Sequence, residues 1–190
     1  ARLQAVIDNR LTDEACQRLY AMLAESERPL IYAGGGVING NATKAMRHFA
    51  SAYGIPVATT LMALGASDTT HPLSLHMLGM HGMAFANYAV EDCDLLIAIG
   101  ARFDDRVAGD PARFAPRAKY IAHFDVDVSE IGKVKRVNWH QVGILARDLD
   151  DLLAYGKRIG FSKEFTTWHA EIAGLKSKHA LNYDRNSKLI

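Results

Sequence analysis

Short, continuously apolar runs alternate along the chain with segments in which apolar residues recur at helical spacing. Continuous apolar runs are typical of strands that are buried on both faces of a parallel sheet. Five such runs lie within residues 30–33, 55–60, 94–100, 119–127 and 141–148. The helical spacing covers residues 13–26, 41–54, 80–93, 148–158 and 161–180. This alternation predicts an α/β fold with a doubly wound, mainly parallel sheet and helices on both faces.

Polar and glycine residues mark the ends of two of these predicted helices. Thr12 precedes the first helix and is expected to cap its amino end. Asn41 stands before the second helix as a possible cap, and Gly54 stands where that helix should stop. We find no internal repeat and no second domain, so the pattern indicates one domain.

Composition excludes several classes of protein. The 190 residues are 49% hydrophobic and 23% charged, with a formal net charge of +1. This balance disfavours partners such as nucleic acid or a membrane surface, which usually require a basic excess. The two cysteines, Cys16 and Cys93, form no CxxC pattern and are expected to be reduced thiols in a cytoplasmic protein. The chain begins with Ala1 and ends after an unpatterned run, so we expect part of a longer protein.

Candidate chemistry gathers just after the predicted strands. Ligands of open parallel sheets bind beyond the carboxyl ends of the strands. Glycines allow close approach of a ligand, hydroxyls and arginines bind phosphate, and a carboxylate suits ribose hydroxyls. These residue types follow the five runs at 34–36, 59–62, 100–106, 125–127 and 147–149. The sequence therefore predicts a cleft of the nucleotide-binding kind.

Simpler interpretations stay open for each group. The three glycines would also serve a tight strand-to-helix connection. Arg102 to Arg106 would also form a surface ion-pair cluster, and Asp125 would also cap the following turn. The stretch GGGVINGN lacks the third glycine of G-x-G-x-x-G, because Asn39 occupies that place, and the second strand ends without an acidic residue. A standard NAD dehydrogenase is therefore disfavoured.

The segment from His76 to Val90 combines methionines with histidines. Its apolar residues would pack in the core or give an adaptable binding surface. His81 lies near the expected start of a helix and is either a core histidine or a ligand contact. The histidines do not show HxxxH or HExxH spacing, so we expect no metal site within this chain.

Four stretches together resemble one family. RPLIYAGGGV, GIPVATTLM, LGMHGMAFANYAVEDCDLLIAIGARFDDRV and HFDVDVSEIGKVK are similar to the central domain of the acetohydroxyacid (acetolactate) synthase large subunit, from about Arg28 to Leu153. LGMHG followed by GARFDDRV is the most specific part. The resemblance implies a Rossmann-like fold of the DHS-like NAD/FAD-binding kind within the thiamine-diphosphate-dependent enzymes. The family joins two 2-ketoacids with loss of carbon dioxide in branched-chain amino acid biosynthesis.

The resemblance also implies the cofactors. FAD would be carried by this domain, where it is required structurally although the reaction has no net redox change. Thiamine diphosphate and Mg²⁺ would belong to the full-length enzyme, because the GDG motif for diphosphate is absent here and the activating glutamate lies in another domain. No catalytic residue is therefore expected in this chain, and alone it should be inactive.

The family pattern assigns positions to the FAD site and to its edge. By resemblance, the residues that line FAD would be Gly35, Thr60, Leu61, Leu78, Gly79, Met80, His81, Gly100, Ala101, Arg102, Phe103, Asp104, Asp125, Val126, Asp148 and Leu149. Asp105 and Arg106 would lie at the edge that faces the substrate channel, where the family's herbicides bind. The usual Gly-Asp-Val near the fifth run reads Arg147-Asp148-Leu149 here, which is a departure from the pattern.

The resemblance divides the chain and implies its partners. Residues 1–27 would be a linker with a lead-in helix, 28–160 the central cofactor-binding domain, and 161–190 a terminal helix with a linker tail. The partners would be the N- and C-terminal domains of the same subunit, further copies in a homo-oligomer, and a regulatory subunit. Two alternatives stay open: the central domain of another thiamine-diphosphate enzyme, or a purely structural module with an empty slot.

Overall fold

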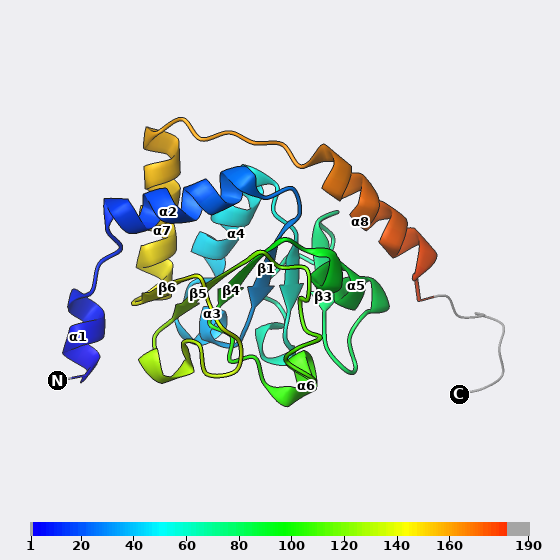
Figure 1. Cartoon of the computed structure of the whole chain (residues 1–190), viewed down its shortest axis with the longest axis horizontal. Coiled ribbons are helices and arrows are strands. Elements are labelled where there is room, and N and C mark those ends of the chain that lie inside the picture. The colour runs from blue at the N-terminus through cyan, green and yellow to red at the C-terminus, as the bar shows by residue number, and fades with distance from the viewer. Residues whose placement is uncertain (1, 182–190) are drawn as a thin grey trace.

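The computed structural model describes residues 2–181 and shows six parallel strands with eight α-helices among them (Figure 1). The strands are β1 Pro29–Ala33, β2 Val57–Thr59, β3 Ser74–Met77, β4 Leu95–Ile99, β5 Tyr120–Asp125 and β6 Trp139–Val142. The helices are α1 Arg2–Asp8, α2 Asp13–Glu25, α3 Gly36–Asn39, α4 Thr43–Tyr53, α5 Ala84–Asp92, α6 Asp105–Ala108, α7 Leu145–Arg158 and α8 Thr166–Lys178, with short 3-10 turns η1 Leu61–Ala63 and η2 Val128–Glu130.

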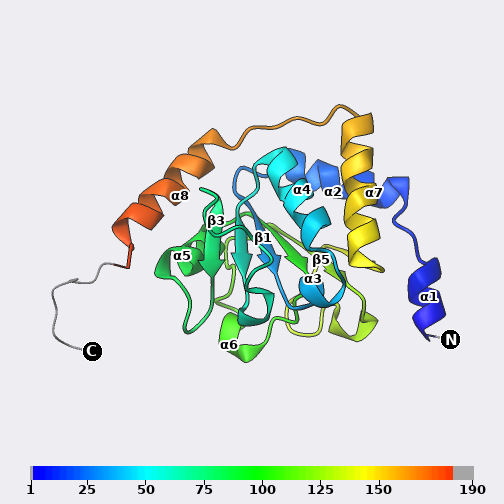
Figure 2. The same cartoon turned by 180° about the vertical axis from the view of Figure 1, so that it is seen from behind.

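The strand order is β3-β2-β1-β4-β5-β6, and every neighbouring pair is parallel. The predicted doubly wound fold is therefore confirmed. Connections from β1 step outward in one direction and those from β4 in the other, so right-handed crossovers put them on opposite faces. Helices α4 and α7 pack together over one face (Figure 2), whereas α5 belongs to the other, and the short α6 lies beyond the carboxyl ends of the strands. The direction changes between β1 and β4.

Local signals in the sequence explain the helix ends, with one exception. The side chain of Thr12 accepts a hydrogen bond from the backbone N–H of Ala15, so Thr12 caps α2 as predicted. Gly54 ends α4 with a left-handed φ of 61°, also as predicted. The prediction of Asn41 as a cap was wrong, because Ala42 is the residue at the start of α4 and gives no side-chain bond.

Two expectations about the strands need correction. Strand β3 was not predicted, because two of its four residues, Ser74 and His76, are polar and the segment does not form an apolar run. The fifth predicted strand, 141–148, is shifted: β6 ends at Val142, and Arg147 to Leu149 lie in the first turn of α7. The bounds of one predicted helix also differ, since α5 begins at Ala84 rather than at residue 80. Two parts of the chain lie outside the described residues: Ala1, and the expected tail after residue 181.

The core explains why the central strands read as unbroken apolar runs. Every residue of β1 and of β4 is buried, since helices or loops cover both faces of these strands. The largest fully buried side chains include Trp168 of α8, Tyr32 of β1 and Phe49 of α4. Burial of a large apolar side chain stabilises a fold by about 1.5–3 kcal/mol. Helices far apart in the sequence thus share one core with the sheet.

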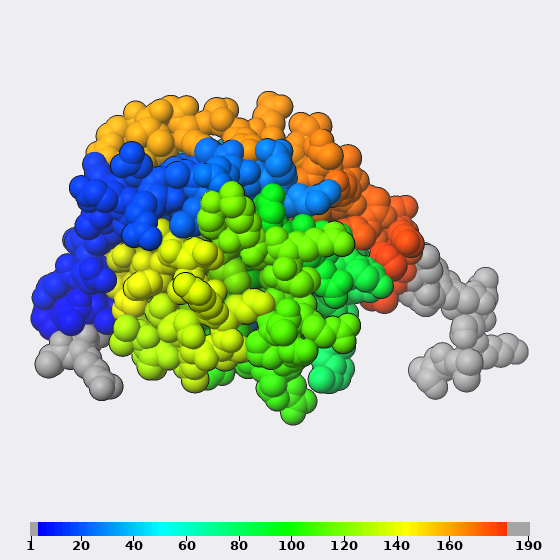
Figure 3. All heavy atoms as spheres, viewed as in Figure 1, coloured from blue at the N-terminus to red at the C-terminus, as the bar shows by residue number. Residues whose placement is uncertain are grey.

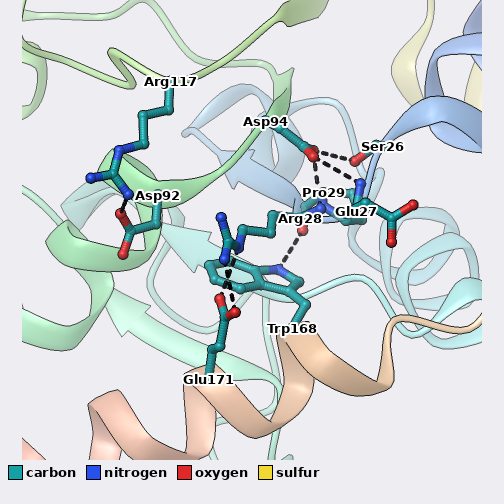
Figure 4. Close-up of polar contacts among 9 residues, drawn as sticks. All are labelled: Ser26, Glu27, Arg28, Pro29, Asp92, Asp94, Arg117, Trp168 and Glu171. Atoms are coloured by element: carbon teal, nitrogen blue, oxygen red, sulfur yellow. Dashed lines mark hydrogen bonds and ion pairs between the residues drawn. The ribbon is translucent and has the colours of Figure 1, made fainter.

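The amino ends of the strands are tied together by side chains (Figure 4). The carboxylate of Asp94 accepts hydrogen bonds from Ser26 Oγ at 2.5 Å, from the Glu27 N–H at 2.8 Å and from the Arg28 N–H at 3.0 Å. Arg28 also donates two bonds of 2.8 Å to the carboxylate of Glu171 in α8. These contacts join the start of β1, the start of β4 and α8 into one unit.

Helix α8 is fastened to the same edge by its tryptophan. Trp168 Nε1 donates to the Pro29 carbonyl at 3.0 Å. The segment that leads to α8 runs along α2, where Lys163 donates to the Ala24 carbonyl at 2.7 Å. In Figure 3 the segment before α8 and the amino-terminal helices lie side by side along the amino edge of the sheet. These contacts attach α2 and α8 to that edge.

Candidate functional site

The carboxyl edge of the sheet, beyond the ends of β1 and β4, is the place where the fold can bind a ligand. At the change of direction, two strand ends contact each other directly. The Gly34 N–H donates to the Ile99 carbonyl at 2.9 Å, and the Gly36 N–H donates to the Gly100 carbonyl at 3.0 Å. These two amides are therefore used within the chain. The sequence allowed two roles for these glycines, a phosphate contact or a tight strand-to-helix connection. For Gly34 and Gly36 the structure supports the tight connection.

The glycines are needed because this contact leaves no room for side chains. A Cβ on Gly36 would lie 2.7 Å from Gly100 Cα, and one on Gly100, whose φ is +56°, would lie 2.6 Å from Gly36 Cα. Gly35 faces another way, since its Cβ would lie 2.9 Å from the Cβ of Met62 in the loop after β2. Gly35 is thus the glycine of the three that stands toward the candidate site.

The loop after β2 presents apolar side chains beside a buried hydroxyl. Leu61 is 66% exposed and Met62 is 70% exposed. Thr60 is buried, and its Oγ1 has no hydrogen-bond partner among the described residues. An unpaired buried hydroxyl is costly, so a partner at this position would be favourable. The Thr60 hydroxyl is therefore a polar group that a ligand at this edge could satisfy.

The loop after β3 is the LGMHG stretch. Leu78 is buried and its N–H donates to the Thr59 carbonyl at 3.0 Å, which fixes the start of the loop against β2. Gly79 has a φ of +97°, a conformation that favours glycine. Met80 is 69% exposed and His81 is exposed as well. The loop thus has a fixed backbone and free side-chain tips.

The charged loop after β4 is organised around Phe103. This residue has a left-handed φ of +54°, yet its ring is buried against Tyr32, Phe114 and His123 at centroid distances of 5.2, 5.9 and 5.3 Å. Tyr32 and His123 flank Ala98 on the same face, and this small residue leaves space for the ring. Strained conformations of this kind persist where packing enforces them, and they often mark functional sites.

The charges around Phe103 have separate surroundings. Asp104 caps α6 through the N–H of Arg106 at 3.1 Å. Arg106 and Asp105 approach to 3.9 Å, but both side chains are largely exposed, so this pair stabilises little. Arg102 is exposed and makes no side-chain hydrogen bond or ion pair with any of residues 2–181. Ala101, by contrast, is buried in the core. The loop is therefore no single salt-bridge network, and Arg102 is available to a ligand.

A buried polar group lies under the same loop. Burial, with the nearby Asp104 carboxylate, raises the pKa of the Tyr32 phenol, and the Phe103 backbone opposes that shift. His123 is fully buried, and its Nε2 lies 3.7 Å from Asp125 Oδ2. Neither Tyr32 nor His123 was singled out as a site residue from the sequence, because each lies inside an apolar run.

The ends of β5 and β6 differ in what they present. Asp125 is 7% exposed and accepts from the Asp127 N–H at 2.9 Å, as the capping alternative expects. Val126 is 51% exposed beside it. Asp148 and Leu149, in contrast, have no exposed surface. The structure therefore brings Asp125 and Val126 to the edge but places Asp148 and Leu149 on the buried face of α7.

Asp148 is held inside the protein. Its carboxylate accepts from Arg147 Nε at 3.1 Å, from Arg147 Nη2 at 3.0 Å and from Gln141 Nε2 at 3.2 Å. Burial nevertheless raises its pKa, and the bonds from Arg147 and Gln141 oppose that shift. Arg147 also donates to the Ile7 and Asn9 carbonyls, which anchors α1. The Arg-Asp pair thus links α1 to α7.

Residues 2–181 show neither a metal-binding cluster nor a membrane-spanning helix. No group of three or more His, Cys, Asp or Glu side chains in this range is placed to hold a metal ion. No helix in the same range is both long enough and apolar enough to cross a membrane. Cys16 and Cys93 are buried free thiols.

Comparison with known proteins gives consistent matches. The family described as "Thiamine pyrophosphate enzyme, central domain" matches residues 16–153. The "Probable acetolactate synthase large subunit" of Methanocaldococcus jannaschii is 50% identical over 155 residues, which are 82% of this chain and 26% of that protein. The "Acetolactate synthase large subunit" of Corynebacterium glutamicum is 45% identical over 167 residues, covering 86% of this chain and 26% of that protein.

A third relative extends the same result. The "Acetolactate synthase isozyme 1 large subunit" of Escherichia coli K12 is 43% identical over 165 residues, covering 87% of this chain and 28% of that protein. The chain therefore spans about a quarter of the length of the curated relatives it matches.

Proposed function

This chain belongs to the family of thiamine pyrophosphate enzyme central domains, and we propose that it is the FAD-carrying central domain of an acetolactate synthase large subunit. In that role the complete subunit joins two 2-ketoacids, pyruvate with pyruvate or with 2-ketobutyrate, and releases carbon dioxide. The observation that carries the proposal is the similarity to proteins named acetolactate synthase over more than four-fifths of the chain. The domain proper corresponds to residues 28–160.

The donor set of the carboxyl edge fits a flavin dinucleotide. Arg102 offers a free guanidinium for a phosphate, Thr60 offers a buried unpaired hydroxyl, and Asp125 offers a carboxylate for ribose hydroxyls. Exposed Leu61 and Met62 offer apolar contact area beside them. When bound, FAD supplies a structural element of the site rather than net redox chemistry. The chain's own residues bind and orient it, and Asp105 and Arg106 face the substrate channel.

Other parts of the subunit complete the proposed enzyme. Thiamine diphosphate and Mg²⁺ are held elsewhere, because this chain has no GDG motif. The N- and C-terminal domains supply that motif and the activating glutamate. We further propose a cytoplasmic homo-oligomer that a regulatory subunit can join. The reduced state of two buried, free thiols is consistent with that compartment.

One observation favours a second candidate, a structural module whose slot holds no flavin. The amides of Gly34 and Gly36 and the carboxylate of Asp148 are already bonded within the chain, so they add nothing to a ligand site. A flavin spectrum separates the two candidates. The complete subunit, purified without added flavin, shows bound FAD if the first is right and none if the second is right.

The activity is tested on the complete subunit and on this chain in parallel. We expect acetolactate formation from pyruvate by the complete subunit that depends on added thiamine diphosphate and Mg²⁺. The 190-residue chain alone should form none, because proximity cannot replace the absent activating groups. A complete subunit that turns over another ketoacid but forms no acetolactate would refute the proposal.

A further inference from the structure

One side chain of α5 holds the loop after β3. The carboxamide of Asn87 makes two hydrogen bonds with a single residue: the Gly79 N–H donates to Asn87 Oδ1 at 2.8 Å, and Asn87 Nδ2 donates to the Gly79 carbonyl at 3.0 Å. A half-turn of the amide would set donor against donor and acceptor against acceptor. The two bonds therefore require the orientation seen here, and they require an amide.

The same loop is bonded on its other side to α6. The Met80 N–H donates to the Arg106 carbonyl at 3.0 Å. A Cβ on Gly79 would lie 2.8 Å from that carbonyl oxygen, so the two backbones are in close contact at the glycine. The contacts thus form one continuous series, from Asn87 to Gly79 and from Met80 to Arg106. It runs from α5 through the loop to α6.

These contacts fix the backbone at Gly79, Met80 and Arg106 but leave the side chains of Met80 and Arg106 free. Met80 is 69% exposed, and the side chain of Arg106 is 74% exposed. Both stand on the same hollow, which Asn87 also lines. The contacts of Asn87 therefore bear on the relative placement of two backbone segments, one of which carries an apolar side chain and the other a cationic one. A site gains precision when its supporting backbone is held in this way.

We propose that Asn87 is a positioning residue that keeps Met80 and Arg106 at a fixed separation at the mouth of the site. The inference rests on the proposed function in one respect: that these two tips face the flavin and the ketoacid path. Asn87 itself touches neither ligand. It acts through the Gly79 peptide.

Replacement by aspartate gives a test with an internal switch. The carboxylate of Asn87→Asp keeps the acceptor for the Gly79 N–H but sets a second oxygen against the Gly79 carbonyl. Once protonated, the carboxyl again offers one donor and one acceptor, as the amide does. Charged groups that line the same hollow, Glu91, Asp105, Asp110, Arg106 and Arg113, set the pH at which this occurs. Asn87→Ala lacks both groups at every pH.

The first measurement is amide hydrogen exchange on the 190-residue chain, expressed as protection factors. In Asn87→Ala we expect the protection factors of both the Gly79 and the Met80 amides to fall by about tenfold. Without the two hydrogen bonds of Asn87, the loop after β3 opens locally more often. In Asn87→Asp the loss should appear at high pH and reverse at low pH. Glu91→Gln, one turn further along α5, is the matched control and should change neither amide. The Ile97 amide in β4 reports global unfolding and should stay constant.

The second measurement uses the complete subunit. We expect Asn87→Ala to raise the KM for pyruvate at least as much as it lowers kcat, and Asn87→Asp to recover toward the wild-type KM as the pH falls. Unchanged protection of Met80 in Asn87→Ala would overturn the inference, as would an Asn87→Asp variant that matches Asn87→Ala at every pH. The exchange result stands even if the subunit forms no acetolactate, so failure of the proposed function is seen separately.

Discussion

The two edges of the sheet use charged side chains in opposite ways. At the amino edge, the charged side chains make hydrogen bonds within the protein (Figure 4). The Asp94 carboxylate accepts from the Arg28 N–H, and the Arg28 guanidinium donates to Glu171. These hydrogen bonds connect the start of β1, the start of β4 and α8. At the carboxyl edge, Arg102 and Arg106 extend into solvent from loops whose backbones are tightly bonded. Charged side chains that have hydrogen-bond partners within the protein stabilise the fold. Charged side chains without such partners, carried on a fixed backbone, are available to a ligand.

The difference teaches where stability and binding reside. At the carboxyl edge, stability comes from the backbone contact of Gly36 with Gly100 and from the buried ring of Phe103. The exposed charged side chains there contribute little to folding. At the amino edge, the side chains themselves hold the segments together. Substitutions of the charged side chains should therefore lower stability at the amino edge and weaken binding at the carboxyl edge.

The largest effect is expected for Gly100→Ala. Its Cβ would meet Gly36 Cα at 2.6 Å in a left-handed conformation, so strand ends must move apart. We expect the free energy of unfolding to fall by about 4 kcal/mol, from overpacking and backbone strain together. Gly160→Ala is the matched control, because its φ is +65° but nothing lies within 4 Å of its Cβ. Urea unfolding that gives equal losses for both would show that the close contact is unimportant.

The next effect concerns the amino edge. Asp94→Ala removes the acceptor of three hydrogen bonds, two of them from backbone amides. Bonds to a charged group are worth about 1.5–3 kcal/mol each before compensation by water, so we expect a loss of about 3 kcal/mol in unfolding free energy. Asp92→Ala breaks only the exposed pair with Arg117 and should cost less than about 1 kcal/mol. Similar losses for both variants would contradict the role given to Asp94.

The third effect should appear in binding alone. In the complete subunit, Arg102→Ala is expected to weaken FAD binding by about 1.5–3 kcal/mol, the scale of a hydrogen bond to a charged group. Arg106→Ala should keep the flavin and lower turnover or herbicide binding. Flavin occupancy and turnover, measured on both variants, test this division. Equal flavin loss from both would mean that the two arginines act as one cluster.

The smallest effect is a pH dependence from Asp148. Because burial raises its pKa, the folded chain holds a proton that the unfolded chain releases just above the ordinary aspartate value of about 3.9. The contribution of Asp148 to stability therefore falls as the pH rises through that window. Asp148→Asn has no proton to lose, so its unfolding free energy should decline less with rising pH than that of the unchanged chain. A steeper decline in the variant would reverse the sign assigned here.

The sequence predicted the parts of the fold that local chemistry decides. The apolar runs of β1 and β4 and the capping residues Thr12 and Gly54 indicated their elements correctly, because burial and hydrogen bonding act over a few residues. β3 was missed because its four residues include Ser74 and His76 and pair with β2 alone. Its place depends on the neighbouring strand, which no local pattern encodes.

The candidate site was predictable in its location but not in its contacts. Strand ends indicated the carboxyl edge, and resemblance supplied the residues expected to line FAD. Two features depend on tertiary packing: the burial of Asp148 on the inner face of α7, and the hydrogen bond from the Gly36 N–H to the Gly100 carbonyl. Asn87 was missed for a similar reason: its partner is a backbone peptide eight residues earlier, brought back by the turn at Gly79. A lone polar residue among Phe85, Ala86 and Ala89 was the available signal.

One paired measurement tests the separation of the two edges most directly. FAD affinity and urea unfolding are measured on the same preparations of the complete subunit carrying Arg102→Ala or Asp94→Ala. We predict that Arg102→Ala loses at least about tenfold in FAD affinity with its unfolding midpoint, measured without flavin, unchanged. Asp94→Ala should show the reverse, a lower midpoint with the same affinity. Loss of flavin in proportion to loss of stability in both variants would contradict the account.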